Sequence, residues 1–315
     1  TLKPTATPTL APTATPTPTA SPGETIPSGV NPFNMGSKCL WVGMSRSAVE
    51  SVLSGYTLRT GTSPQGYDYI ACNNSSYSEY LLIYLKDNQV VGICGIGTVM
   101  NYGSLVTVKD TETTLKANGF SQLSDYNVYE NGSKTTQAGA YSMKDSSGTT
   151  VIAFVDGGGA KNVYCIQVFQ DSTKTNDDMI YADNNTYDAT VVSGIATEIT
   201  NMIRAYGKVY GKTINVANGL STCAQTYADQ AGSTANSIAS RGADDLLDAL
   251  LECDVDPMNW GEACAYKCAD AISAMNSLIT QKEVSVNLRG EYSYIGTGVS
   301  YKRTLLIVMD YCDEL

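Results

Sequence analysis

The sequence contains no histidine. Without an imidazole the chain cannot form a Ser-His-Asp triad, a Cys-His pair, a histidine proton shuttle near neutral pH, or a histidine-ligated zinc or copper site. This absence excludes most of the common catalytic arrangements before any motif is considered.

Basic residues and long apolar runs are also scarce. The 20 lysines and arginines are outnumbered by 31 acidic residues, which gives a net charge of −11, whereas binding to a phosphate backbone needs a clustered basic surface. No stretch approaches the roughly 18 to 20 consecutive apolar residues of a membrane-spanning helix. We therefore predict no nucleic-acid partner and no transmembrane segment in the given chain.

Cysteine is present in an odd number, nine residues. The chain also begins at Thr1 inside a low-complexity run, which suggests an upstream signal peptide or anchor and predicts a secreted or cell-surface protein. We expect disulfides with one thiol unpaired or intermolecular; the alternative is that several cysteines are buried and unoxidised. The cysteines are Cys39, Cys72, Cys94, Cys165, Cys223, Cys253, Cys264, Cys268 and Cys312.

Composition divides the chain into four segments. Residues 1–34 are rich in Thr, Pro and Ala and cannot bury enough surface to fold, so we predict a disordered, extended tether. Residues 35–172 predict an α+β module, residues 173–190 a polar linker, and residues 191–315 a second domain. We expect each domain to have its own core and its own disulfides, which places the unpaired thiol in the second domain.

The first module is internally duplicated. Ser45 is a suitable N-cap for a helix, and the strand-like runs YDYIACN, EYLLIYL and VVGICGIG follow it. The same order recurs about 70 residues later, where a helix through Leu115 precedes TTVIAFV and VYCIQVF. This repetition predicts two helix-plus-hairpin units that share one sheet.

The second domain is mostly helical by pattern and ends in strands. Four helix-like stretches come first, and the strand-like end, which predicts a final hairpin, is YSYIGTGVSYKRTLLIVMDYC. This order predicts helices layered on an antiparallel sheet, so the fold class of the whole chain is α+β. The four stretches are ATEITNMIRAYGKVYG, LSTCAQTYADQAGSTANSIA, ADDLLDALLEC and GEACAYKCADAISAMNSLIT.

Several motifs of the second domain occur together at a characteristic spacing. They are Glu198-Ile199 with Asn201, Asn218-Gly219-Leu220, Ala224-Gln225-x-Tyr227-Ala228, Gly261-Glu262, Met275-Asn276-Ser277 and Ile295-Gly296-Thr297-Gly298-Val299. This series resembles the CAP (SCP-like) domain of cysteine-rich secretory, antigen 5 and pathogenesis-related proteins, in its bacterial form. The resemblance implies an α-β-α sandwich. The first module, through Gly43-Met44-Ser45 and VVGI, resembles the domain that often precedes bacterial CAP domains.

The CAP resemblance implies a cleft lined by two histidines and two acidic residues that can hold a divalent metal. Glu262 matches the first acidic residue, and the histidine positions fall near Ser237 and Glu283. The second acidic position, near residues 275–277, has no clear match. Oxygen ligands alone disfavour zinc and copper and would suit only calcium or magnesium. We therefore predict a degenerate cleft with no metal, no other cofactor and no catalytic residue.

Tyrosine is abundant, with 21 residues against four phenylalanines. Tyr67, Tyr69, Tyr77 and Tyr80 in the first module could form a recognition surface for a glycan or a peptide, because tyrosine offers apolar area and a hydroxyl group at little entropy cost. Tyr84 and Tyr102 extend the same set. The alternative is that these tyrosines are half-buried sheet residues.

Three functions are compatible with these observations. The leading hypothesis is a secreted or surface-displayed, non-catalytic binding protein whose partner is an extracellular protein, a glycan or a lipid. The first alternative is a hydrolase of glycans or peptides that uses Glu262 and Glu283, which would then face each other across one cleft, less than about 10 Å apart. The second alternative is lipid or sterol binding, which needs an apolar groove of about 300 Å³ or more beside the sheet.

Overall fold

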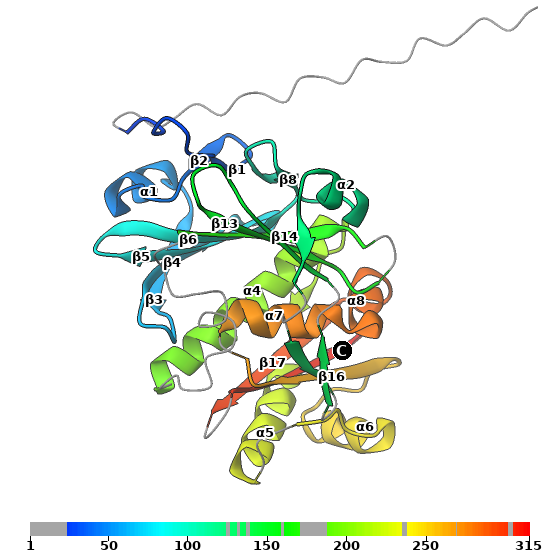
Figure 1. Ribbon diagram of the computed structural model, residues 1–315. Helices are drawn as coiled ribbons and strands as arrows, with labels where there is room; N and C mark the ends of the chain where they lie inside the picture. The colour runs from blue at the N-terminus through cyan, green and yellow to red at the C-terminus, as the bar shows by residue number, and fades with distance from the viewer. Residues whose placement is uncertain are drawn as a thin grey trace, which may run out of the picture.

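The computed structural model describes most of the chain as alternating layers of sheets and helices (Figure 1). An eight-stranded sheet lies on one side, a four-stranded sheet lies on the other, helices α4 (Ala189–Val209) and α7 (Ala271–Thr280) lie between them, and further helices cover the outer faces. The described residues are 24–123, 127–130, 133–136, 139–158, 161–170, 188–234, 238–268, 270–301 and 305–315.

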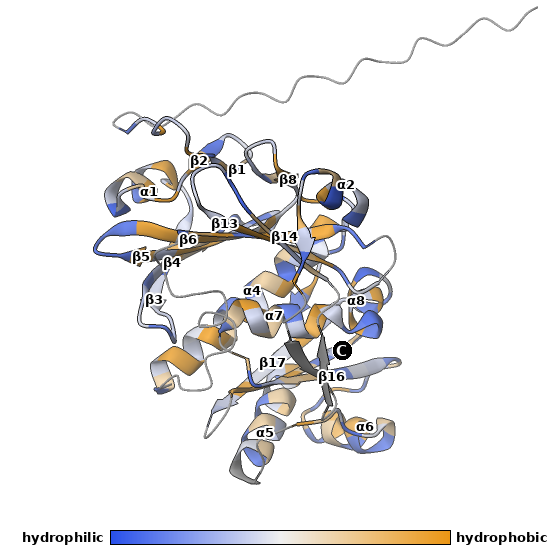
Figure 2. Cartoon of the chain, in the orientation of Figure 1, coloured by the Kyte–Doolittle hydropathy of each residue, from blue (hydrophilic) through white to orange (hydrophobic). Residues whose placement is uncertain are grey.

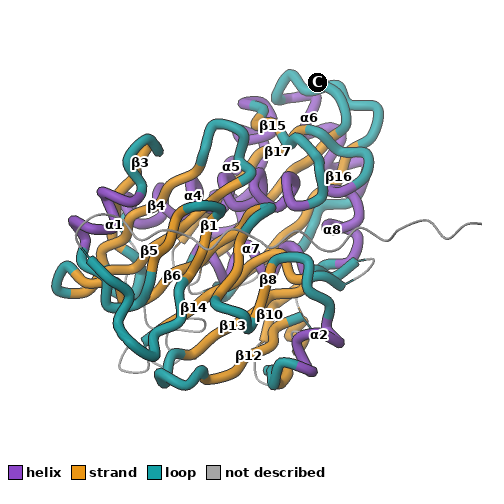
Figure 3. The backbone as a smooth tube through the Cα atoms, turned by 90° about the horizontal axis from the view of Figure 1, so that it is seen from above, coloured by secondary structure: helices purple, strands orange, loops and turns teal. Residues whose placement is uncertain are grey.

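The eight-stranded sheet consists of two four-stranded halves joined at its centre by the antiparallel pair β6 and β14. Figure 3 looks down on this sheet and shows β4, β5, β6, β14, β13 and β12 side by side. In spatial order its strands are β3 (Thr57–Thr62), β4 (Asp68–Asn73), β5 (Glu79–Lys86), β6 (Gln89–Gly97), β14 (Val163–Phe169), β13 (Thr150–Val155), β12 (Ala140–Lys144) and β9 (Ser121–Gln122).

The predicted duplication is confirmed by this order and by the helix that precedes each half. Helix α1 (Arg46–Val52) is capped by the side chain of Ser45, and α2 (Glu112–Ala117) is capped by that of Thr111. Two residues before each cap the backbone turns through a positive φ, 93° at Gly43 and 76° at Lys109. The two repeats therefore share the geometry of their helix starts as well as their strand order.

A smaller sheet and a hairpin complete the N-terminal half. The sheet has the order β2 (Lys38–Leu40), β1 (Phe33–Met35), β7 (Met100–Tyr102) and β8 (Val106–Thr107), and the hairpin pairs β10 (Asn127–Glu130) with β11 (Ser133–Thr136). The predicted tether, residues 1–34, extends too far. Strand β1 begins at Phe33, and the Ser45 hydroxyl donates to Glu24 at 2.6 Å, so both residues belong to the folded part.

The C-terminal half is an α-β-α sandwich. Its sheet has the order β15 (Asn215–Val216), β17 (Tyr294–Tyr301), β18 (Leu305–Cys312) and β16 (Trp260–Tyr266), and the predicted final hairpin is the pair β17 and β18. Helix α4 lies on one face of β17 and α5 (Asn218–Thr234) on the other (Figure 1). The remaining helices are α6 (Ala243–Glu252) and α8 (Lys282–Arg289).

One element of the C-terminal half was predicted wrongly. The stretch GEACAYKCADAISAMNSLIT was expected to be one helix, but its first part is strand β16 and only Ala271–Thr280 forms α7. The later part of β16 is buried on both faces, so it has no apolar alternation and resembles a buried helix segment by pattern.

Two glycines of β17 allow α5 to pack directly on the sheet. A Cβ atom at Gly296 would lie 2.1 Å from the carbonyl carbon of Leu220, and one at Gly298 would lie 2.3 Å from that of Ala224. Any side chain at these positions would push the helix away, so the Ile-Gly-x-Gly-Val motif is explained by close backbone packing.

The expectation of a separate core for each half is wrong. One continuous hydrophobic cluster extends from Phe33 in β1 through α4 and α7 to Tyr311 in β18, and apolar colour in Figure 2 marks both sheets and the helices between them. Polar contacts also cross the junction: Tyr164 donates to Asn276 at 2.6 Å, and Tyr210 donates to Asp156. The two halves therefore fold around a shared layer of helices.

Candidate functional site

Two carboxylates lie side by side on neighbouring strands of the C-terminal sheet. Glu262 on β16 is the register partner of Asp310 on β18, and both side chains are completely buried. Because an isolated buried carboxylate costs several kcal/mol, this pair needs a cation or protons to be tolerated.

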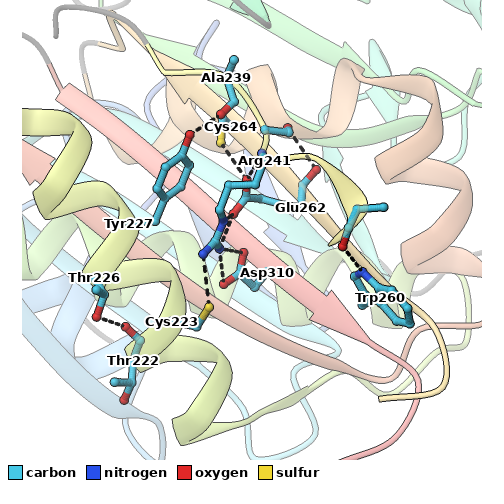
Figure 4. Close-up of polar contacts among 12 residues, drawn as sticks. Thr222, Cys223, Thr226, Tyr227, Ala239, Arg241, Trp260, Glu262, Cys264 and Asp310 are labelled. Carbon is cyan, nitrogen blue, oxygen red and sulfur yellow. Dashed lines mark hydrogen bonds and ion pairs between the residues drawn. The ribbon is translucent and has the colours of Figure 1, made fainter. Parts of the chain in front are cut away.

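Arg241, from the segment between α5 and α6, supplies that cation (Figure 4). Its backbone N–H and its Nε each donate to Glu262 at 2.7 Å. Its Nη2 also donates to Glu262, and it donates to each Asp310 oxygen at 3.1 Å. The Arg241 side chain is 12% exposed. One guanidinium group therefore binds both carboxylates and leaves neither free.

The remaining surroundings of the guanidinium hold it in place. The ring of Tyr227 stacks on it with the ring centroid 4.5 Å from the Arg241 Cζ atom, and the Tyr227 hydroxyl donates to the carbonyl of Ala239 at 2.8 Å. On the far side Nη1 donates to the sulfur of Cys223 at 3.4 Å. Figure 4 shows the side chain extended between these groups. The cluster is thus packed around the arginine.

The protonation states follow from burial. Burial raises the pKa of Asp310 well above its usual value, the neighbouring Glu262 charge raises it further, and the Arg241 charge acts in the opposite direction. Burial alone would lower the pKa of Arg241, but the hydrogen bond to Glu262 and the charges of both carboxylates raise it overall. Burial also raises the pKa of Cys223 to about 12. Burial thus favours a proton on Asp310 and on the Cys223 thiol, while Arg241 is held in its charged form by Glu262 and Asp310.

The residues of this cluster do not fit a divalent metal. A metal ligand must be a deprotonated thiolate, a carboxylate or a neutral imidazole, and here the thiols of Cys223 and Cys264 have raised pKa values while Arg241 occupies the carboxylates. Within the described ranges no group of three or more Cys, Asp or Glu side chains is arranged to hold a metal ion.

The structure places the three predicted cleft residues differently. Glu262 is in the buried cluster, Glu283 is exposed in the first turn of α8, and Ser237 lies outside the described residues. The sequence left the second acidic position open near residues 275–277, where Asn276 instead accepts from Tyr164 in the buried α7.

Sequence reasoning missed Arg241 and Asp310. Asp310 carried a signal, because it is the single charged residue in the otherwise apolar run LLIVMDYC and lies in a fully buried strand. Arg241 carried none that separates it from a surface arginine, since its partners are 21 and 69 residues away in sequence.

The tyrosines do not form an exposed surface. Tyr67, Tyr69 and Tyr80 are buried, with Tyr80 completely inaccessible and its hydroxyl donating to Glu198 at 3.0 Å. Tyr77 is half-buried beneath the guanidinium of Arg204, 3.6 Å from the ring centroid. These tyrosines therefore pack in and around the sheet, which corrects the prediction of an exposed recognition surface. Tyr84 and Tyr102 are buried as well.

A groove of about 520 Å³ lies at the junction of the two halves. Strand β3 forms one wall and the first turns of α4 form the other. Tyr69 lines it and lies against two glycines, because a Cβ at Gly61 would be 2.5 Å from its ring and one at Gly194 would be 2.9 Å from its hydroxyl. The hydroxyl groups on the walls belong to Thr60, Thr62, Thr190, Ser193 and Thr197.

Inside the groove, the opposite charges of Arg59 and Glu198 neutralise each other. Arg59 donates to Glu198 through Nε at 2.9 Å and through Nη2 at 2.8 Å, and it also donates to Asn73 at 2.6 Å. Because Arg59 belongs to β3 and Glu198 to α4, this pair also joins the two halves. The groove thus presents hydroxyl groups, the compensated ion pair and the carboxylate of Asp188, which caps α4.

Comparison with known proteins identifies the fold. No protein-family model matches the sequence, and no curated protein matches it. The solved structure of an extracellular protein containing an SCP domain from Bacillus anthracis str. Ames is similar with a TM-score of 0.65 and 13% identity, over 87% of this chain and 94% of that one. A cysteine-rich secretory protein from Staphylococcus aureus subsp. aureus Mu50 is similar with a TM-score of 0.66 and 14% identity, over 85% and 93%.

These likenesses show that the chain has a CAP-like α+β fold. Because residues 191–315 are less than half of the chain, an alignment over 87% of it also extends into the N-terminal half. Among the helices of the described ranges, none is long and apolar enough to span a membrane.

Proposed function

We propose that the protein is a secreted or surface-displayed, non-catalytic binding protein with a degenerate CAP domain. Its N-terminal half would be the CAP-associated module, and residues 1–23 would be the tether that carries the folded part. The observation that carries the proposal is the binding of both buried carboxylates, Glu262 and Asp310, by the guanidinium of Arg241.

The same contact supports the proposed loss of metal binding. A divalent ion would have to displace Arg241 from Glu262, and Arg241 cannot lose its proton to leave as a neutral group. The position that a metal would fill is therefore taken by a cation that is part of the chain. This supports a cleft that works without metal.

The hydrolase alternative is less well supported. General acid/base work on a glycan needs two carboxyl groups that reach the same bond, but Glu262 is buried against Arg241 while Glu283 is exposed on α8. Lipid binding is also less well supported, because the walls of the groove at the junction carry hydroxyl groups.

The junction groove is the place where we expect a ligand to bind. Its volume is within the usual range for ligand sites, and such sites occur preferentially where two parts of a protein meet. The hydroxyl groups, the compensated Arg59–Glu198 pair and the Asp188 carboxylate favour a polar ligand without negative charge, such as a glycan or a segment of an extracellular protein.

Thermal unfolding with and without added metal tests the proposal. Zinc, calcium or magnesium at micromolar concentration is expected to leave the melting temperature unchanged, since a tight ligand of the native state would have to raise it. A clear stabilisation of the wild type that disappears in Glu262→Gln would show a working metal site and would refute the degenerate cleft.

A further inference from the structure

Two cysteine sulfurs are in direct contact at the centre of the large sheet. The Sγ atoms of Cys94 on β6 and Cys165 on β14 are 3.3 Å apart, and both residues are buried. All nine cysteines lie in the described ranges and are present as thiols. A sulfur pair this close is separated from a covalent bond only by a small displacement.

The strand register explains the contact. In the antiparallel pair β6 and β14, Cys94 is opposite Gln167 and Cys165 is opposite Ile96, so the two cysteines are diagonal neighbours on the same face. Diagonal side chains approach each other when the strands twist. The register between β13 and β14 shifts next to Cys165, and such a bulge increases the local twist.

Four of the other thiols contact nitrogen or oxygen atoms. Cys223 accepts from Arg241, Cys264 lies 3.8 Å from a Glu262 oxygen, Cys268 lies 3.7 Å from the carbonyl of Tyr266, and Cys312 lies 2.9 Å from the carbonyl of Glu314. The sheet centre is therefore the favoured position for a cross-link.

We propose that Cys94 and Cys165 are a disulfide-forming pair that joins the two repeats across β6 and β14. Oxidation forms one S–S bond and breaks two S–H bonds; the two electrons and two protons pass to a disulfide oxidant, which is reduced to two thiols. The sulfur separation decreases from 3.3 Å to about 2.05 Å, mainly through rotation of the two side chains. This inference does not depend on the proposed function.

Burial determines when the reaction takes place. Burial raises the pKa of the Cys94 thiol well above its usual value, and a thiolate is needed for exchange with a disulfide. The folded sheet therefore protects both thiols, and oxidation takes place while the strands are assembling or open. Once formed, the bond is equally protected from reductants.

The bond is expected to stabilise the fold strongly, because it closes a loop of 71 residues. A loop of this length lowers the unfolding equilibrium constant by on the order of a thousandfold in the chain-entropy account. The urea midpoint of the oxidised protein is therefore expected to be clearly higher than that of the reduced protein.

Refolding under two redox conditions tests the pair. The full chain is unfolded in urea and refolded either with dithiothreitol or with a mixture of reduced and oxidised glutathione, then alkylated and digested without reduction. In the glutathione sample we expect a linked peptide containing Cys94 and Cys165, a protein mass lower by two hydrogen atoms after correction for alkylation, and two fewer free thiols.

Serine variants provide the controls. Cys94→Ser and Cys165→Ser should each abolish the linked peptide, whereas Cys72→Ser, which removes a buried thiol from β4 of the same sheet, should retain it. The inference is overturned if the wild type refolds with all nine thiols free under the glutathione mixture. Linked peptides that join other cysteines in comparable yield would overturn it as well.

Discussion

Replacement of Arg241 by alanine would leave Glu262 and Asp310 buried without a cation. The Arg241 side chain is 12% exposed and both carboxylates are fully buried, so water cannot replace the guanidinium at little cost. Breaking a buried pair by removal of one partner typically costs about 3 to 5 kcal/mol. The loss should therefore exceed that of any exposed ion pair in the chain.

The expected magnitude can be obtained from protonation. Without Arg241, a second carboxyl group must be neutral to stay buried, and neutralising a glutamic acid with the reference pKa of about 4.3 costs about 3.7 kcal/mol at pH 7. At pH 5 the same requirement costs about 1 kcal/mol. The variant should therefore lose less stability at pH 5 than at pH 7.

Urea unfolding of the wild type and Arg241→Ala at pH 7 and pH 5 measures this difference. Arg46→Ala is the control, because Arg46 forms an exposed pair with Glu50 that is worth less than about 1 kcal/mol. A loss below about 1 kcal/mol at pH 7, or a loss that does not decrease at pH 5, would refute the account of the cluster.

Three further predictions follow from the packing. Asp310→Asn should keep the contacts of a neutral carboxyl. Because the pKa of Asp310 is raised in the folded protein, this carboxyl favours folding most below about pH 4, and its contribution is lost as the pH rises. The variant should therefore show a flatter pH profile of stability and no loss at pH 7. Gly298→Ala should lower the free energy of unfolding in urea by about 1 to 3 kcal/mol, because its Cβ would meet the backbone of Ala224 at 2.3 Å. Gly148→Ala is the control for backbone strain alone, because Gly148 has a φ of 84° and open space around it. Proteolysis between residues 173 and 190 should give two fragments that co-elute in gel filtration because they share one core; separate elution would contradict it.

The sequence predicted the parts of the fold that depend on local pattern. The repeats could be found because each repeat has its own cap and strand runs, and the final hairpin because β17 and β18 are adjacent in the chain. The motif with Gly296 and Gly298 pointed to the CAP-like sandwich. These features all lie within short stretches of chain.

Features that depend on distant contacts were not predictable. The apolar stripe of α4 contains Ile199, Met202 and Ile203, but Glu198, one turn before Met202, is also buried because it pairs with Arg59 of β3. A polar residue on a helix normally indicates solvent, so the second sheet could not be inferred from α4. The same holds for Arg241, whose partners come from two distant strands.

The helices between the two sheets also limit how this architecture can be recombined. A fragment with only residues 188–315 would present the sides of α4 and α7 that pack on the larger sheet, including Ile195, to water, and a contiguous apolar surface of that kind promotes aggregation. Grafting the CAP-like half onto another carrier therefore requires either the duplicated sheet to accompany it or a redesigned polar surface on these two helices. In this chain the portable unit is the pair of halves.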